Sequence, residues 1–163
     1  MKLELFTNQN ELEEYLKVAV LSMPSVAAQN IIPDSFRKEI CEGLKFTQSL
    51  SSDFRADVGP WILYALRNDA NEIIGALMFS KDRHIKSAAQ LEYLGIREDQ
   101  QKKGYGTLII KEIIKEVKKH SDYKFATFST SPRMTEYYEK LGFKCAGTAE
   151  FPHSTRCFFY KEI

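Results

Sequence analysis

The sequence has little net charge and no long hydrophobic run. Its 23 basic residues nearly balance 22 acidic ones, which leaves a formal net charge of +1. A balance this even argues against a dedicated nucleic-acid binder. No apolar run approaches the roughly 20 residues that span a bilayer, and the opening stretch MKLELFTNQNELEEYL lacks the apolar segment of a signal peptide. We therefore expect neither a nucleic acid nor a membrane as a partner.

Cysteine is also scarce, with only Cys41, Cys145 and Cys157 present. The number is odd and no Cys-x-x-Cys occurs, so we expect neither a disulfide framework nor a metal site. Cys145 and Cys157 can face each other across a late hairpin, but two half-buried packing residues are the favoured interpretation. A reducing, cytoplasmic setting is the expectation that follows.

What is present is ordinary globular composition, with 163 residues of which 44% are hydrophobic and 28% charged. This suffices for one core, so we expect a single domain over residues 1–163. Apolar alternation predicts strands, and apolar residues at helical spacing predict helices. The predicted strands cover residues 2–7, 61–68, 72–80, 88–96, 123–130, 143–151 and 154–163, and the helices cover 8–23, 35–46, the stretch that ends at 120, and 132–141.

The resulting order, β-α-α-β-β-β-α-β-α-β-β, predicts an α/β fold with a mixed, mostly antiparallel sheet of about seven strands and four helices. Residues 91–129 should place two parallel strands beside each other through a right-handed crossover. Asn8 or Asn10 is expected to cap the first helix and Asp34 the second. Gly142 follows the last helix, where a C-terminal glycine is common. Residues 24–34 and 47–60 are expected to be loops.

The stretch QKKGYG, residues 101–106, places two glycines at the mouth of a helix, where each costs about 1 kcal/mol relative to alanine. Glycine lets a phosphate approach the free N–H groups of a helix N-terminus. A dinucleotide fingerprint is excluded because Ile109 stands where that motif needs a third glycine. The phosphate loop of nucleotide-triphosphate-binding proteins is excluded because Gly-Lys followed by Ser or Thr is absent. A Gln/Arg-x-x-Gly-x-Gly phosphate loop remains, beside the alternative that the glycines only ease a tight turn.

Two further stretches carry a family resemblance over essentially the whole chain. YYEKLGF, residues 137–143, resembles the Y-E-K-L-G-F signature of the GNAT N-acetyltransferase superfamily, and QKKGYG resembles its pyrophosphate loop. LEYLGI, residues 91–96, resembles the family strand before that loop. Glu98 replaces a frequent proline, Lys102 a frequent glycine and Ser131 a frequent asparagine. The last of these departures puts a contact near the pantetheine arm in doubt.

The resemblance implies acetyl-CoA as the acetyl donor. A bulge in the strand before the loop would splay it from its neighbour and admit the pantetheine arm, and Gly95 suits such a bulge. Lys102 and Lys103 either pair with phosphates or are simply solvated. The predicted acetyl-CoA-binding residues are Leu94, Gly95, Ile96, Gln101, Lys102, Lys103, Gly104, Tyr105, Gly106, Thr107 and Ser131.

The implied reaction moves an acetyl group to a primary amine of a small molecule or peptide by direct attack through a tetrahedral intermediate. Tyr138 matches the family position that protonates the leaving thiolate, whereas Tyr137 is expected to pack on the sheet. Glu92 is the first candidate for the base because the other strand position is Gln90, which cannot accept a proton in this way. His153 is a second candidate.

Loops should surround the acceptor, with Phe46, Phe54, Trp61, Phe151 and His153 available to shape the pocket and Asp53, Asp57 and Glu150 to attract a cation. The alternative function is a CoA-binding sensor or partner-binding module with little or no catalysis. A homodimer is possible because late strands in this family often pair between subunits.

Overall fold

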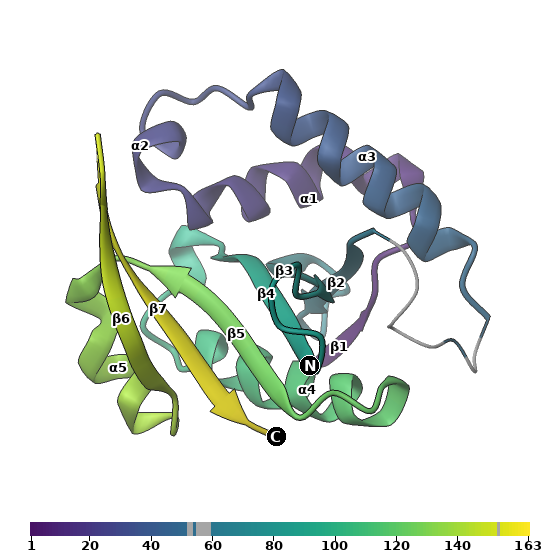
Figure 1. Cartoon of the computed structure of the whole chain (residues 1–163). Coiled ribbons are helices and arrows are strands. Elements are labelled where there is room, and N and C mark those ends of the chain that lie inside the picture. The colour runs from purple at the N-terminus through teal and green to yellow at the C-terminus, as the bar shows by residue number, and fades with distance from the viewer. Residues whose placement is uncertain (52–53, 55–59, 153) are drawn as a thin grey trace.

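A seven-stranded mixed sheet with helices on both faces forms the body of the protein (Figure 1). The computed structural model describes residues 1–51, 54, 60–152 and 154–163. In space the strand order is β1-β2-β3-β4-β5-β7-β6, and only the β4–β5 pair is parallel. The strands are β1 (Lys2–Leu5), β2 (Ile62–Arg67), β3 (Ile73–Lys81), β4 (Ala88–Ile96), β5 (Phe125–Thr130), β6 (Lys144–Phe151) and β7 (Ser154–Glu162). The predicted mixed, mostly antiparallel sheet of seven strands and its parallel pair are therefore confirmed.

Five α-helices lie in the described residues, one more than predicted. They are α1 (Leu12–Ala19), α2 (Pro24–Ala27), α3 (Asp34–Gln48), α4 (Tyr105–His120) and α5 (Thr135–Lys140). Figure 1 shows α1 to α3 on one side of the sheet and α4 and α5 on the other. The additional helix is the short α2, which begins at Pro24 in a segment predicted to be a loop. A proline at the first helical position suits such a start because its φ is already helical.

Helices on both faces explain why β2 and β3 read as continuous apolar runs. Ile62 and Tyr64 on β2 pack into the core beneath α4, while Leu63 and Ala65 between them pack into the core beneath α1 and α3. All six residues of β2 are buried. Strands covered on both faces have no need of polar alternation.

The helix caps agree in part with expectation. Asn8 caps the short 3₁₀ turn that leads into α1, with its side chain accepting from the Asn10 N–H at 3.1 Å. Gly142 follows α5 with φ of +82°. The prediction for Asp34 is wrong, because Pro33 is the N-cap of α3 and Asp34 is already its first helical residue.

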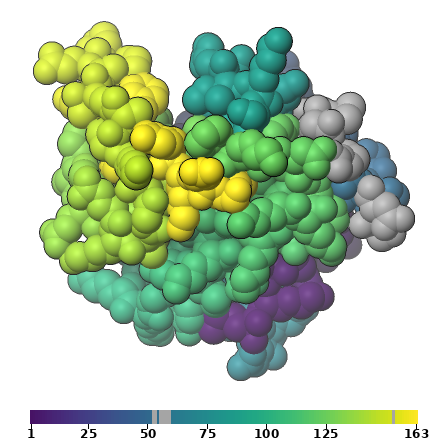
Figure 2. All heavy atoms as spheres, turned by 60° about the horizontal axis from the view of Figure 1, so that its bottom comes forward, coloured from purple at the N-terminus to yellow at the C-terminus, as the bar shows by residue number. Residues whose placement is uncertain are grey.

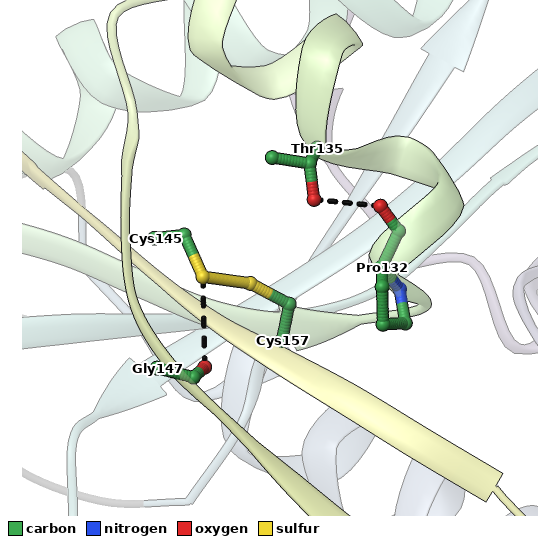
Figure 3. The surroundings of a disulfide bond; sticks show 5 residues. All are labelled: Pro132, Thr135, Cys145, Gly147 and Cys157. Atoms are coloured by element: carbon green, nitrogen blue, oxygen red, sulfur yellow. Dashed lines mark hydrogen bonds between the residues drawn. A yellow bond between two sulfur atoms is a disulfide. The ribbon is translucent and has the colours of Figure 1, made fainter.

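The late cysteines are joined, so the interpretation of two half-buried packing residues is wrong. Cys145 on β6 and Cys157 on β7 form a disulfide whose Cα atoms lie 6.4 Å apart (Figure 3), within the range that such bonds span. Cys145 is exposed and Cys157 is buried. Cys145 faces Phe159 in the sheet and reaches Cys157 because the register shifts between Cys145 and Gly147. The number of cysteines and their spacing in the sequence do not reveal this shift. Cys41 is free.

Strands β6 and β7 form one end of the sheet. Figure 2 shows the surface hollowed between this yellow-green end and the teal segment that follows β3. Within the described residues, no helix combines the length and hydrophobicity that crossing a membrane requires. The single-domain assignment to residues 1–163 stays a prediction.

Candidate active site

The parallel strands β4 and β5 separate partway along their length. They pair only where Ala88 to Gln90 face residues 125–127, although β4 continues to Ile96 and β5 to Thr130. Beyond the pairing, Leu91, Phe128 and Thr130 line a cavity of about 290 Å³, which we call the first cavity. The splay expected from the family resemblance is therefore present.

A bulge in β4 accompanies this separation. Ala76 of β3 faces Gly95 and Met78 faces Glu92, so Tyr93 and Leu94 together oppose one residue. Tyr93 has φ of +52°, which non-glycine residues rarely adopt. The bulge therefore lies at residues 93–94, and its predicted location at Gly95 is wrong.

Gly95 serves a different purpose, the close approach of α1 to β4. A Cβ atom at Gly95 would lie 2.0 Å from the carbonyl oxygen of Val18 and 2.9 Å from its carbonyl carbon. Only a residue without a side chain fits between the two elements. The sequence marks the glycine correctly but does not distinguish a bulge from a contact with a distant helix.

The loop before α4 has an open N-terminus. Gly104 is the N-cap with φ of +84°, and a Cβ atom there would have no neighbour within 4 Å. The first N–H that bonds back into the turn belongs to Leu108, which donates to the Gly104 carbonyl at 3.0 Å. The preceding N–H groups lie at the positive end of the helix dipole. This arrangement fits a phosphate group.

Other loop residues hold the loop in place. The Gln101 side chain donates to the Ile96 carbonyl at 3.0 Å, and the Gln101 N–H donates to the Glu98 carbonyl at 3.2 Å. The Gln101 N–H is thus engaged within the protein. Lys102 has φ of +60°, the conformation for which the family glycine is suited. Both Lys102 and Lys103 are exposed.

The remaining predicted binding residues occupy varied positions. Leu94 lines the first cavity, and Tyr105 packs half-buried against the core beneath α4. Thr107 bonds through its hydroxyl to the Tyr137 hydroxyl at 3.1 Å. A Cβ atom at Gly106 would meet only that same hydroxyl, at 3.2 Å. Ser131 precedes the turn that leads into α5 and is half-buried.

Tyr138 of α5 also lines the first cavity. Its side chain is buried, with its ring 4.4 Å from that of Phe128 and 5.5 Å from that of Phe159. Burial raises the pKa of its phenol to about 12, with a smaller contribution from the charge of Tyr137. Tyr138 is therefore the member of the tyrosine pair that faces the cavity.

Glu92 lines the first cavity and also a second one of about 600 Å³. Phe128 and Ser129 are the other two residues shared by both walls. Burial raises the pKa of the Glu92 carboxyl first, and the negative charge of Glu39 adds to the effect. The Gln90 side-chain amide donates to the Glu92 carboxylate. Glu92 thus stands where the two cavities meet.

The second cavity opens between the segment after β3 and the last strands. Arg83 and Ile85 line one side, and Phe158 and Tyr160 of β7 line the other, at the hollow visible in Figure 2. Of the residues predicted to shape an acceptor pocket, Trp61 lines this cavity.

The other predicted acceptor-pocket residues lie elsewhere. Phe46 and Phe54 pack into the core beneath α4, and Glu150 and Phe151 are exposed near the tip of the last hairpin. Asp53, Asp57 and His153 lie outside the described residues.

Sequence reasoning missed three residues at this location. Glu39 of α3 lines the second cavity and accepts a hydrogen bond from the Tyr93 hydroxyl at 3.1 Å. Arg156 lines the first cavity and donates to the carbonyl and hydroxyl of Ser129 at 2.7 and 3.0 Å. The third residue is Tyr93, which forms part of the bulge in β4. No local pattern marks them, because each depends on an element far away in the sequence.

Comparison with solved structures finds the same fold in several proteins, two of which are named as acetyltransferases in complex with CoA. An aminoglycoside 6'-N-acetyltransferase complexed with coenzyme A is 17% identical, with 99% of this chain and 97% of that chain covered at a TM-score of 0.71. A Bacillus subtilis acetyltransferase in complex with CoA is also 17% identical, with 99% and 98% covered and a TM-score of 0.68. Escherichia coli ElaA is 12% identical, with 99% of both chains covered and a TM-score of 0.68. At these identities the likeness shows a shared fold.

A family model provides the remaining comparison. The model of the acetyltransferase (GNAT) family matches residues 26–143, which is well over half of the chain. A comparison with curated proteins finds no match. The matched region contains the splayed strands, the bulge, the glycine loop and Tyr138. The chain therefore belongs to the acetyltransferase (GNAT) family of N-acetyltransferases, whose acetyl donor is acetyl-CoA.

Proposed function

We propose that the protein transfers the acetyl group of acetyl-CoA to a primary amine of a small molecule or peptide, with Glu92 and Tyr138 handling the protons. One observation carries this proposal. Glu92 stands in the wall shared by two adjoining cavities, and Tyr138 faces the first of them. A thioester in the first cavity and an amine in the second would then meet beside a carboxylate.

The donor would occupy the first cavity and the loop before α4. The open N-terminus at Gly104 to Thr107 would hold the pyrophosphate, because its N–H groups are free of intrahelical partners. The pantetheine arm would lie along β4 beyond Gln90, where β4 no longer pairs with β5. The bulge at Tyr93 and Leu94 leaves backbone groups outside the regular ladder. An N–H near Leu94 or Gly95 would donate to the thioester oxygen.

Proton transfer follows from the two pKa shifts. An alkyl ammonium must lose a proton before it can attack, and a carboxylate with a raised pKa is a better acceptor than an ordinary one. Glu92 would take that proton, directly or through water. Tyr138, with a pKa of about 12, remains protonated at neutral pH and would give its proton to the departing thiolate. Two protons leave nitrogen, one from the ammonium and one from the tetrahedral intermediate. One of them replaces the proton that Tyr138 gives to sulfur and the other passes to solvent, so the transfer balances.

An acceptor screen that measures release of CoA thiol tests the proposal. Tyr138→Phe keeps the ring that packs against Phe128, so the fold should be retained while kcat falls by roughly a hundredfold, the lower end for general acid catalysis. Tyr137→Phe is the matched control; it removes the bond to the Thr107 hydroxyl, so its KM for acetyl-CoA can change while kcat at saturating acetyl-CoA should be retained. Glu92→Gln should lower kcat/KM and remove the acidic limb of its pH profile.

Two outcomes would count against these roles. Unchanged turnover in Tyr138→Phe would remove this residue from the mechanism. Tight acetyl-CoA binding without thiol release above hydrolysis for any amine would instead favour the CoA-binding sensor. The oligomeric state also belongs to the proposal, because β6 is an exposed edge strand that suits pairing with a second copy. Sedimentation velocity would test for the homodimer.

A further inference from the structure

Three carboxylates line the second cavity, and two of them come from a helix and from a strand of the sheet. Glu39 comes from α3 and Glu92 from β4. They lie close enough for the charge of Glu39 to raise the pKa of Glu92. Like charges held together in a partly buried site cost free energy, which a bound cation would offset.

Neither carboxylate forms an ion pair within the described part of the chain, although Arg83 and Arg156 lie near enough to lower the pKa of Glu92. Glu39 accepts from the Tyr93 hydroxyl at 3.1 Å, and Glu92 accepts from the Gln90 amide. Both donors are uncharged. Each carboxylate oxygen can accept more than one hydrogen bond, so acceptor capacity remains.

A third carboxylate on the same wall serves as a contrast. Asp82 accepts from the Thr127 hydroxyl at 2.5 Å and from the backbone N–H groups of His84 and Ile85 at 2.8 and 3.0 Å. These bonds hold together the turn that follows β3 and attach it to Thr127 of strand β5. Asp82 is therefore engaged by three donors in the turn, whereas Glu39 and Glu92 each accept the one uncharged donor named above.

Glu39 is also held in a defined position. The Tyr93 ring that donates to it packs edge-on against Phe36, one turn earlier on α3, with ring centroids 4.8 Å apart. Tyr93 is fixed in turn by the bulge. A carboxylate oriented in this way loses little conformational entropy when it binds a ligand.

The rest of the wall suits an alkyl chain that carries positive charge. Trp61, Phe158 and Tyr160 are aromatic, and their ring faces attract ammonium groups and cover methylene groups. Arg83 lines the same cavity but is exposed, and Arg156 lines the first cavity with its guanidinium bonded to Ser129. Among the described residues that line the second cavity, the cation Arg83 and the neighbouring His84 are exposed, so none of its buried groups offers a positive charge to an acceptor carboxylate.

Given the proposed N-acetyltransferase function, on which this inference rests, we infer that the acceptor is a short aliphatic diamine. Glu39 binds the distal ammonium through an ion pair, and Glu92 faces the amine that reacts. Glu39 is thus a specificity-determining residue. A cavity of about 600 Å³ accommodates such a chain.

The test compares three acceptors of equal carbon count: 1,4-diaminobutane, butylamine and 4-aminobutanoate. In the wild type, kcat/KM for the diamine should exceed the other two by about tenfold or more, the usual gain from a charge-assisted pair. Glu39→Gln keeps an acceptor for the Tyr93 hydroxyl and should abolish this preference by raising KM for the diamine. Glu42→Gln, an exposed change on the same helix, is the matched control and should leave the preference intact.

The pH profile separates a charge effect from a structural one. The charged groups near Glu92 are Glu39, which raises its pKa, and Arg83 and Arg156, which lower it. Removing the charge of Glu39 lowers the pKa of Glu92, so the acidic limb of kcat/KM with butylamine should move to lower pH. A merely structural role would leave this limb in place.

The possible failures can be told apart. Equal kcat/KM for butylamine and the diamine, or an unchanged preference in Glu39→Gln, overturns the diamine inference but leaves acetyl transfer standing. Absence of thiol release with every amine overturns the proposed function. In that case calorimetry with 1,4-diaminobutane decides the site itself: binding that Glu39→Gln abolishes supports it, and no binding overturns it.

Discussion

Two glycines with matched positive φ angles allow the proposed phosphate-binding loop to be tested against an internal control. Gly104 at the start of α4 has φ of +84°, and Gly142 after α5 has φ of +82°. Alanine at either position would impose nearly the same conformational strain. Only Gly104 lies at the open N-terminus of α4. Gly104→Ala and Gly142→Ala therefore place alanine at nearly the same φ, but only Gly104→Ala adds a methyl group at the N-terminus of α4.

The expected cost to stability is small and similar for both variants. A non-glycine residue in the left-handed region costs about 1–2 kcal/mol, partly offset by the lower entropy of the unfolded chain. No atom lies within 4 Å of a Cβ at Gly104, and at Gly142 the nearest atom is the Lys161 Nζ at 3.2 Å, the end of a flexible side chain. Each variant should unfold about 2–4 °C lower for each kcal/mol lost, as expected for a chain of this length.

Acetyl-CoA binding should separate the two variants. A methyl group at Gly104 projects where a pyrophosphate must approach the N–H groups, and a hydrogen bond to a charged group contributes about 1.5–3 kcal/mol. Loss of one such bond weakens binding by roughly tenfold to a hundredfold. Isothermal calorimetry with acetyl-CoA, at a temperature where both variants are folded, measures the difference. Equal affinity in the two variants would refute the assignment of the pyrophosphate to this loop.

Three further predictions concern stability. Gly95→Ala places a methyl group 2.0 Å from a carbonyl oxygen of α1 and should cost about 3 kcal/mol or more in urea unfolding; a cost below about 1 kcal/mol would show that α1 and β4 are not packed this closely. Lys102→Gly removes a non-glycine residue from a φ of +60°. The folded protein should become more stable by about 0.5 kcal/mol, once the entropic cost of glycine is subtracted from the strain that is relieved. A less stable variant would show that the backbone at Lys102 is not strained. Arg67 is paired with Glu4 and Glu11. Hydrogen bonds from Lys2 and then from Arg67 lower the pKa of Glu4, and the bond from Arg67 lowers the pKa of Glu11; the stability that these pairs contribute is therefore present above the ordinary pKa of 4.5 and lost as the pH falls through the lowered values. Arg67→Met should flatten acid unfolding in that range, and an unchanged profile would show that the pairs do not contribute.

The elements that the sequence predicts well are those fixed by local pattern. Strand β4 runs from Ala88 to Ile96, as the alternation and flanking residues indicate. The left-handed turn at Gly104 is indicated by a local requirement, a backbone that only glycine adopts easily, and its binding of phosphate stays a prediction. Tyr138 is marked by its place within the stretch YYEKLGF, and its role in proton transfer stays a prediction. Each of these features depends on neighbours within a few residues.

The residues that were missed depend on contacts across long stretches of sequence. Tyr93 sits in an apparently regular strand, and nothing near it indicates a positive φ. The conformation of Tyr93 depends on two helices. Helix α1 approaches the neighbouring Gly95, and Glu39 of α3 accepts a hydrogen bond from the Tyr93 hydroxyl. Glu39 lies 54 residues earlier in the chain. The disulfide was missed for a related reason, because a register shift in β6 decides which side chains meet Cys157.

The strain at Tyr93 argues that its side chain has a role beyond forming the bulge. Glycine would adopt φ of +52° without penalty, whereas tyrosine pays about 1–2 kcal/mol there. Such strain persists only where surrounding contacts impose it. At Tyr93 those contacts are the Phe36 ring and the Glu39 carboxylate, both from α3. The bulge opens the first cavity, while the side chain that projects from it orients a carboxylate in the second. A glycine would preserve the first effect and lose the second, so the tyrosine links the geometry of the first cavity to that of the second.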